Sequence, residues 1–345
     1  MSILTQRLVP ISLEEGRAVL AAVYGITGDL VAMTSERDQT FRVEAADGRR
    51  FVFKISNPAE RPEIIAYQRA AMRHLADADP DLPVPRPLEP RERDDGIVSF
   101  RDGTHRIVSL LSFLDGRPLY AAPASAAQAA DIGRALGRLD AGFVGFDPNV
   151  PDQDGLLWNH ARLPALRPLL DHVDPARRGL AAAVLDRFDA EARPIFEALP
   201  RQVIHNDFNP HNLLVDGDTG ERVTGVIDFG DMVVGPRVQD LAVALAYQIE
   251  RGGGLDLADA LLAGYAEHIA IGDDEAAILP AMVAARMAMT IVIGEWRAGL
   301  YPASRDYILR NHPAAVRGLA LLAAHPATRL ADLARRARDR ASDGD

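Results

Sequence analysis

The feature that most constrains this chain is a pair of polar loops, each attached to short apolar segments. Asp207 and Asn212 lie in the first loop, and Asp228 opens the second. Short apolar segments of this kind predict strands, which would hold the loops between them in fixed positions. The apolar segments are 203–204, 213–215 and 226–227.

The order and spacing of these side chains indicate phosphoryl transfer of the kinase type. The first loop reads His205-x-Asp207-x4-Asn212, and Asp228 of Ile-Asp-Phe-Gly follows Asn212 by sixteen residues. In such a site one Asp accepts the proton of the substrate hydroxyl, while an Asn and a second Asp hold Mg²⁺ on the phosphates. Either motif alone is weak, but their combination is specific. The alternative is a β-hairpin with a polar turn.

An upstream lysine supports the same interpretation. Lys54 lies in the apolar segment 50–56 and is the only lysine of the chain. A sequence that otherwise uses arginine indicates a specific need for a compact ammonium there, and the kinase lysine that meets the α- and β-phosphates lies in such a strand. The alternative is an exposed strand lysine. Asp47-Gly48 predicts a hairpin that joins this strand to the preceding one.

The nucleotide would also contact two other segments. The loop 34–40 contains Ser35, Gln39 and Thr40 as candidate phosphate-binding residues but no glycine, so its backbone N–H groups and hydroxyls would replace a glycine-rich loop. An ordinary turn is the alternative. The base would meet the segment near Leu111 and Phe113, whose side chains do not distinguish ATP from GTP.

Composition narrows the class of protein. The 345 residues suggest two domains, and the absence of cysteine excludes disulfides and thiolate chemistry. The net charge of −11 argues against a nucleic-acid partner and is compatible with steering a cationic substrate or with solubility alone. No uninterrupted apolar run of about 18 residues and no N-terminal apolar leader is present, so we expect a cytoplasmic protein without a membrane partner. The sequence leaves the oligomeric state open.

The order of predicted elements indicates an α+β fold with two lobes. Ser12-Leu-Glu-Glu15 predicts the start of a helix that ends near Gly25. Residues 1–113 are expected to form a small nucleotide-binding lobe around an antiparallel sheet, and residues 114–345 a mostly helical lobe with the catalytic loop and substrate site. In the second lobe we expect strands only around the two polar loops. Strands are predicted near 29–34, 39–45, 50–56, 96–101 and 105–113, and helices near 61–76, 124–142, 176–198, 237–250, 256–270, 275–298 and 313–323.

The charged segment 329–340 predicts an amphipathic helix. This helix would bind an acidic partner or a membrane surface, or it would fray into solvent as a terminal helix. The second interpretation is the simpler one.

Together these motifs resemble the aminoglycoside phosphotransferase and choline kinase superfamily, a small-molecule branch of the protein-kinase-like fold, over about residues 20–325. Within it, the segments 38–41, 225–232, 240–247, 285–302 and 307–308 look like hydroxylysine kinase. The resemblance implies that Asp207 is the catalytic base, that Asn212 and Asp228 bind Mg²⁺, and that Lys54 meets the phosphates of ATP or GTP. It also implies an acceptor that is a small amine or amino acid, with 5-hydroxylysine as the best candidate.

Several expected residues depart from the protein-kinase pattern or carry weaker signals. Gln68 occupies the helix position where kinases pair the lysine with Glu, and Glu63 is an alternative partner. His205 and His211 are interpreted as structural, because no third metal ligand accompanies them. Asp231 would steady the metal site or cap a helix. For the substrate we consider Asp240 and Glu295 as carboxylates for an amine, and Arg286 as a guanidinium for a carboxylate, or alternatively as part of an ion pair between helices.

Two other classes of function remain open at this point. One is a kinase for another amino alcohol, for homoserine or for an aminoglycoside. The other is a nucleotide-binding module without catalysis, which the simultaneous presence of Lys54, Asp207, Asn212 and Asp228 disfavours. Trp296 and Tyr301 are interpreted as core residues.

Overall fold

The computed structural model describes residues 10–35, 38–92, 96–147, 149–151, 155–252, 254–326 and 328–342. Residues 1–9, to which the expectation of no leader applies, lie outside this set, as do two positions of the expected phosphate loop, 36 and 37. The chain forms two compact units, Met1–Asp115 and Gly116–Asp345.

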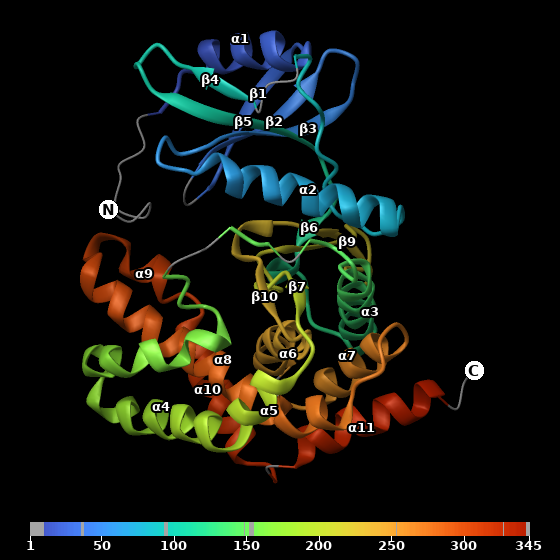
Figure 1. Cartoon of the computed structure of the whole chain (residues 1–345), viewed down its shortest axis with the longest axis vertical. Coiled ribbons are helices and arrows are strands. Elements are labelled where there is room, and N and C mark those ends of the chain that lie inside the picture. Colours follow the sequence, from blue (N-terminus) through green and yellow to red (C-terminus); the bar gives the residue numbers. More distant parts are fainter. Residues whose placement is uncertain are drawn as a thin grey trace. The chain divides into compact units, whose positions relative to one another are not determined.

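The first unit is a five-stranded antiparallel sheet with a helix on each face (Figure 1). The strand order β1-β2-β3-β5-β4 confirms the expected sheet. Its elements are α1 (Leu13–Tyr24), β1 (Gly28–Met33), β2 (Gln39–Ala45), β3 (Arg50–Ile55), α2 (Pro62–Ala78), β4 (Ile97–Ser99) and β5 (His105–Ser112).

Helix α1 begins and ends where the sequence predicts. The Ser12 hydroxyl accepts the N–H of Glu15, and Gly25 closes the helix in the left-handed conformation at φ 66°. The Glu15 carboxylate does not complete a capping box but accepts the backbone N–H of Arg101 at 2.7 Å. The cap therefore also fastens α1 to the loop between β4 and β5.

Alternation along β3 separates the core of this unit from its polar side. Phe51, Phe53 and Ile55 are buried in one cluster with residues of α1, and the Phe53 ring lies 6.4 Å from Tyr24 in an edge-on arrangement. Since successive strand residues point to opposite faces, Lys54 projects from the other face. A one-residue slip of register would bury the ammonium in the phenylalanine cluster, so this core fixes where Lys54 points.

The second unit is mostly helical. Its helices are α3 (Ala126–Gly142), α4 (Pro175–Arg187), α5 (Arg193–Ala198), α6 (Val238–Gly252), α7 (Asp256–Ala266), α8 (Asp273–Leu300), α9 (Arg305–Ile308), α10 (His312–Ala323) and α11 (Arg329–Ser342). Its strands are β6 (Arg117–Pro118), β7 (Gln202–Ile204), β8 (Leu213–Val215), β9 (Val223–Val226) and β10 (Val233–Gly235). Strands β6, β8 and β9 form one small sheet, and β7 and β10 another.

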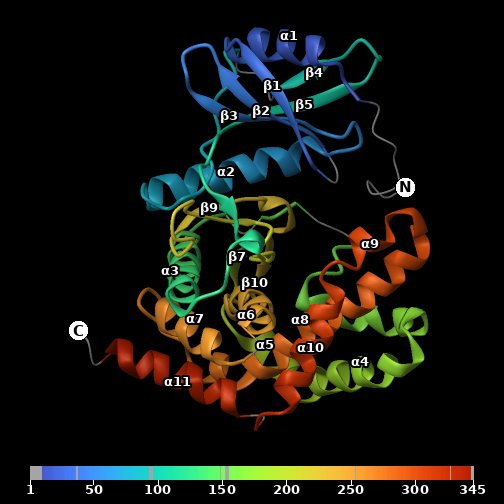
Figure 2. The same cartoon turned by 180° about the vertical axis from the view of Figure 1, so that it is seen from behind.

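Helix α6 lies in the middle of this unit, with α3 and α7 on one side and α4, α8 and α10 on the other, as the two opposite views agree (Figures 1 and 2). Helices α3 and α7 approach closely because two glycines face the partner backbone. A Cβ at Gly133 would lie 2.0 Å from the Leu261 carbonyl oxygen, and one at Gly264 would lie 2.0 Å from that of Ala130. Any side chain at either position would push the helices apart.

Three expectations for this unit need correction. Strands were expected only around the two polar loops, but the structure also has β10 and the short strand β6. The 3-10 segment His160–His172 and helix α9 are additional elements. The expected helix 176–198 contains a π-helical turn, Phe188–Ala192, directly before Pro194. Proline lacks the N–H that would continue the α-helical ladder, which accounts for the irregular turn.

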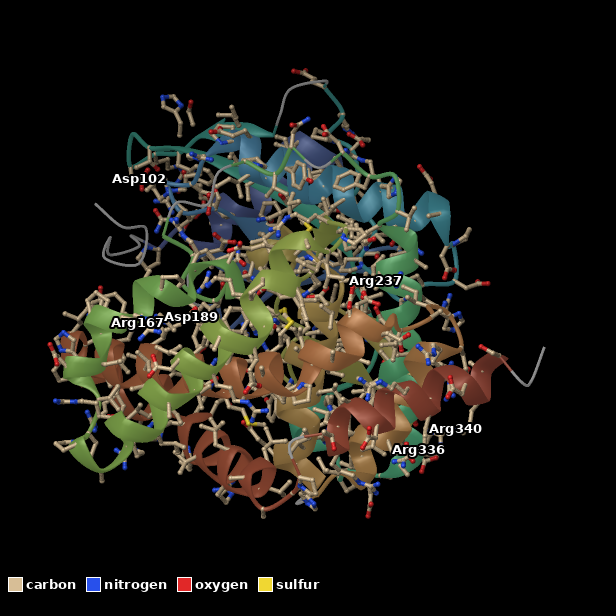
Figure 3. The ribbon with its side chains drawn as sticks, turned by 60° about the horizontal axis from the view of Figure 1, so that its bottom comes forward. Asp102, Arg167, Asp189, Arg237, Arg336 and Arg340 are labelled. Atoms are coloured by element: carbon tan, nitrogen blue, oxygen red, sulfur yellow. The ribbon has the colours of Figure 1, made fainter. Side chains whose placement is uncertain are left out.

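The C-terminal helix α11 does not fray. Leu330, Leu333 and Ala337 are buried against the unit, Arg338 pairs with Asp273 at 2.7 Å and Arg340 with Asp259 at 2.9 Å. Figure 3 shows Arg336 and Arg340 along this helix. The helix is therefore part of the domain.

Helix α8 is the one described helix whose length and hydropathy would allow it to cross a membrane. The sequence expectation considered only uninterrupted apolar runs and did not single it out. Since 83% of its most apolar window is buried inside the protein, it serves here as the core helix of the second unit.

Candidate active site

The first polar loop connects β7 and β8, and its turns are closed by its own backbone. Asn209 donates its N–H to the Asp207 carbonyl oxygen at 2.8 Å, and Asn212 donates its N–H to the Asn209 carbonyl oxygen at 3.0 Å. The His211 N–H bonds to the Asn209 side chain at 2.7 Å. The loop is therefore internally fixed between its two strands, as the sequence pattern predicts.

Within this loop the expected base and one expected metal ligand are in direct contact. The Asn212 amide nitrogen donates to Oδ2 of Asp207 at 2.7 Å and to the Asp207 carbonyl oxygen at 3.0 Å. The amide nitrogen of Asn212 is thus committed to Asp207, and its amide oxygen is the atom suited to a metal ion. The structure brings these two predicted residues together.

Asp228 is joined to the same loop through the backbone. The Ile227 N–H donates to the Asn212 carbonyl oxygen at 2.9 Å, so the second polar loop is anchored directly beside Asn212. The Asp228 carboxylate accepts the Gly230 N–H at 3.2 Å and is exposed. All three residues expected from the motif therefore lie on two connected loops of one unit.

Two residues of these loops have left-handed backbone conformations. Asn206 and Asp228 both have φ 66°, and among the described residues they are the non-glycine positions with positive φ. Asn and Asp tolerate this conformation better than other side chains, yet it persists only where surrounding contacts enforce it. Its occurrence beside both Asp207 and Asn212 marks the loops as a functional region.

A divalent ion would find few protein ligands here. The described residues contain no group of three His, Asp or Glu side chains arranged to hold a metal. Asn212 and Asp228 offer oxygen ligands on adjacent loops, and Mg²⁺ is usually bound by one or two carboxylates with the remaining positions taken by phosphates and water. The donor set fits an ion that arrives with a nucleotide.

Asp240 supports the catalytic loop and does not face a substrate. Its Oδ2 accepts the His205 N–H at 2.7 Å and its Oδ1 accepts the Asn206 N–H at 2.5 Å. The side chain is fully buried, and burial raises the pKa of Asp240, an effect partly offset by His205 and these N–H groups. Because both oxygens are engaged, the expectation that Asp240 binds a substrate amine is corrected.

His205 is a buried structural residue, in agreement with the sequence interpretation. Its Nδ1 accepts the Asp207 N–H at 3.3 Å, and its Nε2 lies 3.2 Å from the Ile227 carbonyl oxygen. The imidazole therefore connects the first polar loop, at Asp207, to the second, at Ile227. It lies edge-on to Phe208 and Phe229, with ring centroids 6.0 and 5.0 Å away.

Arg286 lies at the catalytic loop and is a member of an ion pair, which is the second of its two expected roles, although its partner is on a loop and not on a helix. Its Nη2 donates to Oδ1 of Asp207 at 2.8 Å, and its side chain is only 2% exposed. Burial acts to lower the pKa of Arg286, but Tyr247 and Asp207 outweigh it and the pKa is raised. The guanidinium is consequently committed to a carboxylate of the protein, and the expectation that it is open to a substrate carboxylate is corrected.

Glu295 is likewise committed to structural contacts. Its oxygens accept the Asp174 N–H at 2.6 Å and Nε of Arg177 at 2.9 Å, and Nε2 of His312 lies at 2.6 Å. Burial acts to raise the pKa of Glu295, yet these donors outweigh it and lower the pKa. Glu295 joins three segments of the helical unit, so the expectation that it recognises an amine is also corrected.

Asp231 lies beside the same loops. It ends the 3-10 turn Phe229–Asp231, and its carbonyl oxygen accepts the Asn206 side-chain N–H at 3.0 Å. Its carboxylate contributes to the raised pKa of Arg286. Asp231 therefore contributes to the electrostatics around Arg286, and its two expected roles, at the metal site or as a helix cap, stay predictions.

In the first unit, Lys54 is paired with a residue that sequence reasoning did not assign to it. Its Nζ lies 3.1 Å from Oδ2 of Asp38, whose side chain is 12% exposed. The other candidate, Glu63, pairs with Arg61 at 3.2 Å on the exposed start of α2. Gln68 is half-buried on α2. A carboxylate that pairs with Lys54 thus comes from Asp38, directly before β2.

The expected phosphate-loop residues separate into different roles. Gln39 bonds through both side-chain atoms to the backbone of Ile11, at 2.7 and 2.8 Å, so its assignment to the nucleotide is corrected. Ser35 accepts the Asp38 N–H at 3.3 Å. Thr40 lies opposite Lys54 in the sheet register, and its buried hydroxyl has no hydrogen-bond partner within the described residues. Thr40 is therefore well suited to a ligand that approaches Lys54.

The expected base-binding segment ends β5. Leu111 lies opposite Val52 in the register and forms an isolated bridge with Pro87. Phe113 donates its N–H to the Arg50 carbonyl oxygen at 3.3 Å, and its ring lies 4.9 Å from the Arg50 guanidinium. Both residues belong to the first unit together with Lys54.

Three contributors to the site are missed by sequence reasoning. Asp38 had a signal, because it directly precedes the strand that pairs with the Lys54 strand. Tyr247 also had one, since it lies seven residues after Asp240 and thus on the same face of α6. Trp158 lies in an irregular segment without periodicity, so no local pattern could indicate its contact with Arg286.

Comparison with known proteins agrees with this geometry. Residues 30–281 match the family described as the phosphotransferase enzyme family. The chain is 27% identical to a hydroxylysine kinase from Mus musculus over 322 residues, covering 86% of this chain and 85% of that protein. It is 28% identical to a homoserine kinase from Rhizobium etli over 217 residues, covering 61% and 62% of the two chains.

Solved structures extend the comparison to the fold. An aminopropanol kinase described as microcompartment-associated superposes with a TM-score of 0.67 at 18% identity, over 94% of this chain and all of the other. The amicoumacin kinase hAmiN, solved in complex with AMP-PNP, Ca²⁺ and Ami, superposes with a TM-score of 0.58 at 15% identity, over 91% of this chain and 88% of the other. These likenesses confirm the protein-kinase-like α+β fold.

The motif, the loop geometry and the family match agree with one another, and more than half of the chain lies within the matched region. The chain therefore belongs to the phosphotransferase enzyme family, and it is a kinase that transfers phosphate to an alcohol group of a small molecule.

Proposed function

We propose that this enzyme transfers the γ-phosphate of a nucleoside triphosphate to the side-chain hydroxyl of an amine-bearing amino acid, with 5-hydroxylysine as the best candidate. The connected loop of Asp207, Asn212 and Asp228 carries the proposal of phosphoryl transfer. The choice of acceptor is supported by the similarity to hydroxylysine kinase over most of both chains.

The proposed roles follow from the chemistry of each side chain. Asp207 orients the acceptor hydroxyl and takes its proton, while Lys54, held by Asp38, contacts the α- and β-phosphates. Asn212 and Asp228 hold Mg²⁺, which when bound neutralises charge on the transferred group. Phosphoryl transfer needs little covalent help from the protein, so positioning and charge account for most of the rate.

The proposal divides the work between the two parts of the chain. Residues 1–113 form the nucleotide-binding lobe, with Thr40 and Ser35 near the phosphates and Leu111 and Phe113 near the base. Residues 114–345 form the lobe that carries the catalytic loop and the acceptor site. The donor is ATP or GTP, and we expect the reaction to take place in the cytoplasm.

Other acceptors form the main alternative. Homoserine is favoured by the similarity to a homoserine kinase over about three fifths of the chain. Amino alcohols such as ethanolamine and aminoglycosides such as kanamycin are further candidates that the catalytic loop does not discriminate. A nucleotide-binding module without catalysis would have no need for the Asp207–Asn212 contact.

The test is nucleotide turnover with Mg²⁺, using ATP and GTP in parallel, against hydroxylysine, homoserine, ethanolamine, choline and kanamycin. We expect turnover that depends on hydroxylysine and falls roughly 10²–10⁴-fold in Asp207→Asn, the usual contribution of a general base. Turnover with a different acceptor would keep the mechanism and reject the substrate. Binding of nucleotide without turnover of any acceptor would reject the enzyme assignment for these substrates.

A further inference from the structure

Arg286 is a buried cation whose position is fixed from several directions. Its guanidinium carbon lies 4.8 Å from the centre of the Trp158 ring and 5.9 Å from that of Tyr247. Aromatic faces attract a cation, and the attraction is stronger where water is excluded. The side chain therefore has little freedom to swing.

The two ends of the guanidinium fork join two segments far apart in the sequence. Nη1 donates to the carbonyl oxygen of Trp158 at 3.1 Å, and Nη2 donates to Oδ1 of Asp207 at 2.8 Å. A planar fork makes both bonds only in one orientation. The Nη1 end of the guanidinium is held by the backbone of Trp158. This contact therefore determines the direction from which Nη2 donates its hydrogen bond to Asp207.

The opposite edge of the Asp207 carboxylate is held as well. The Asn212 amide donates to Oδ2 at 2.7 Å, so each carboxylate oxygen has its own donor from a different part of the unit. A carboxylate held on both oxygens cannot rotate about its terminal bond without losing a charge-assisted hydrogen bond. Its plane, and hence the lone pairs left for an acceptor hydroxyl, are thereby determined.

A substrate carboxylate could reach this guanidinium only at a high cost. The side chain of Arg286 is 2% exposed, whereas that of Asp207 is 22% exposed. An incoming anion would have to displace Asp207 from Nη2, which would leave the catalytic carboxylate without its cationic partner. Asp207, and not Arg286, is the member of the pair that is open to the acceptor.

From this geometry we infer that Arg286 is a positioning residue that fixes the orientation of the Asp207 carboxylate for the acceptor hydroxyl, and that it does not bind a carboxylate of the substrate. The inference rests on the proposed role of Asp207 as the base. It assigns to α8, a helix outside the two polar loops, a direct part in setting up the reaction. The Asp207 carboxylate then needs no reorientation when an acceptor binds.

Kinetics with two acceptors that differ only in a carboxylate distinguish whether Arg286 positions Asp207 or binds the carboxylate of the substrate. The acceptors are 5-hydroxylysine and 1,5-diaminopentan-2-ol, which is the same molecule without its carboxyl group. For Arg286→Gln we expect kcat to fall roughly 10²-fold with both acceptors, as for a misplaced catalytic group, with KM nearly unchanged. Arg286→Lys keeps the charge but not the fork and should recover part of the lost kcat.

Arg237→Gln is the matched control. Arg237, labelled in Figure 3, also pairs with a carboxylate, holding Glu275 at 2.9 and 3.0 Å, and within the described residues its side-chain hydrogen bonds go to Glu275 and to the Ala270 carbonyl oxygen. We expect this variant to keep kcat while losing an arginine–carboxylate ion pair, although one with a more exposed arginine. Thermal unfolding of all variants verifies that they are folded. If Arg286→Gln does not fold, the kinetic comparison is made with Arg286→Lys.

The outcomes distinguish this inference from the proposed function. An increase of KM confined to hydroxylysine, with kcat preserved, would show that Arg286 binds the substrate carboxylate and would overturn the inference. Unchanged kcat in folded variants would overturn it too. If the wild type turns over neither compound, the substrate proposal fails. The kcat values are then compared with the acceptor that supports turnover, or for nucleotide hydrolysis by water. A crystal structure of Arg286→Gln in which Asp207 has not moved would contradict the inference in either case.

Discussion

The carboxylate of Asp240 accepts the backbone N–H of His205 at 2.7 Å, so a buried acid on α6 holds the first residue of the catalytic loop. The adjacent N–H of Asn206, a residue in the left-handed conformation, is bound to the other oxygen. One side chain thus satisfies two buried backbone donors where the chain turns sharply. This contact gives α6 control over the geometry of the loop.

Replacing Asp240 with Asn should therefore affect both stability and catalysis. One carboxylate oxygen becomes an amide N–H₂ that faces a backbone donor, and an unsatisfied buried donor costs roughly 1–3 kcal/mol. We expect a loss of stability of this size in chemical denaturation, together with a reduced kcat. Asp259→Asn, which removes an exposed partner of Arg340, is the control and should change stability by less than about 1 kcal/mol. Equal stability of the two variants would contradict the assigned role.

The pair of Asp207 and Arg286 predicts an unusual consequence of inactivating the enzyme. Asp207→Asn removes the negative charge facing a buried guanidinium, so we expect the inactive variant to lose roughly 1–3 kcal/mol of stability. Asp228→Asn should lose activity without this penalty, because an amide oxygen can still accept the Gly230 N–H. Thermal unfolding of both variants makes the comparison. A more stable Asp207→Asn would contradict the importance of the ion pair.

The contact between Lys54 and Asp38 predicts a specific effect on nucleotide binding. In Asp38→Asn the ammonium loses the ion pair with Asp38, and we expect KM for the nucleotide to rise about fivefold, equivalent to roughly 1 kcal/mol for a partly exposed pair. KM for the acceptor should stay the same. Glu44→Gln, which removes an exposed ion pair on the same hairpin, should leave both values unchanged. A larger effect on the acceptor than on the nucleotide would exclude this role for Asp38.

Glu250 predicts a dependence of stability on pH. Burial raises the pKa of Glu250 from 4.5 to about 8, with partial compensation from Arg317 and Arg286. Between these two pH values the folded state keeps a proton that the unfolded state has released. The stability that protonated Glu250 contributes is therefore fully present below pH 4.5 and is lost as the pH rises to about 8. We expect the stability of Glu250→Gln to match that of the wild type near pH 4.5 and to exceed it by up to about 5 kcal/mol above pH 8, the free energy that corresponds to moving the pKa from 4.5 to about 8.

Denaturation of Glu250→Gln and wild type at several pH values measures this difference directly. The control is Glu197→Gln, whose carboxylate pairs at the surface with Arg193 and for which no such trend is expected. A stability difference between Glu250→Gln and wild type that does not change with pH would contradict the buried, protonated state of Glu250.

The packing of α11 predicts that the C-terminal helix is needed for stability. Truncation before Arg329 would expose the surfaces of α7 and α8 that Leu330 and Leu333 cover, and each lost leucine contact costs roughly 1.5–3 kcal/mol. Arg340→Ala removes only a surface ion pair and should cost less than about 1 kcal/mol. Denaturation of the truncated and substituted proteins compares the two contributions. An unchanged midpoint after truncation would show that α11 contributes little.

The local architecture could be derived from the sequence because its determinants are close together in the chain. The alternation of Phe51, Phe53 and Ile55 fixes the face from which Lys54 projects, and the caps at Ser12 and Gly25 fix the ends of α1. The loop with Asp207 and Asn212 spans only a few residues between two strands. In each case the spacing along the backbone determines the geometry, and a pattern of residue types suffices to predict it.

The partners of these residues were decided by tertiary structure. Arg286 and Asp207 are 79 residues apart, and the sequence offered Arg286 equally as a substrate ligand or as an ion-pair member. Asp240, Gln39 and Glu295 carried polar groups that looked available, but folding uses them to satisfy buried backbone and arginine donors. A sequence motif thus specified which groups we propose for the chemistry, whereas packing decided which groups hold them, because a buried charge takes the partner that the fold places beside it.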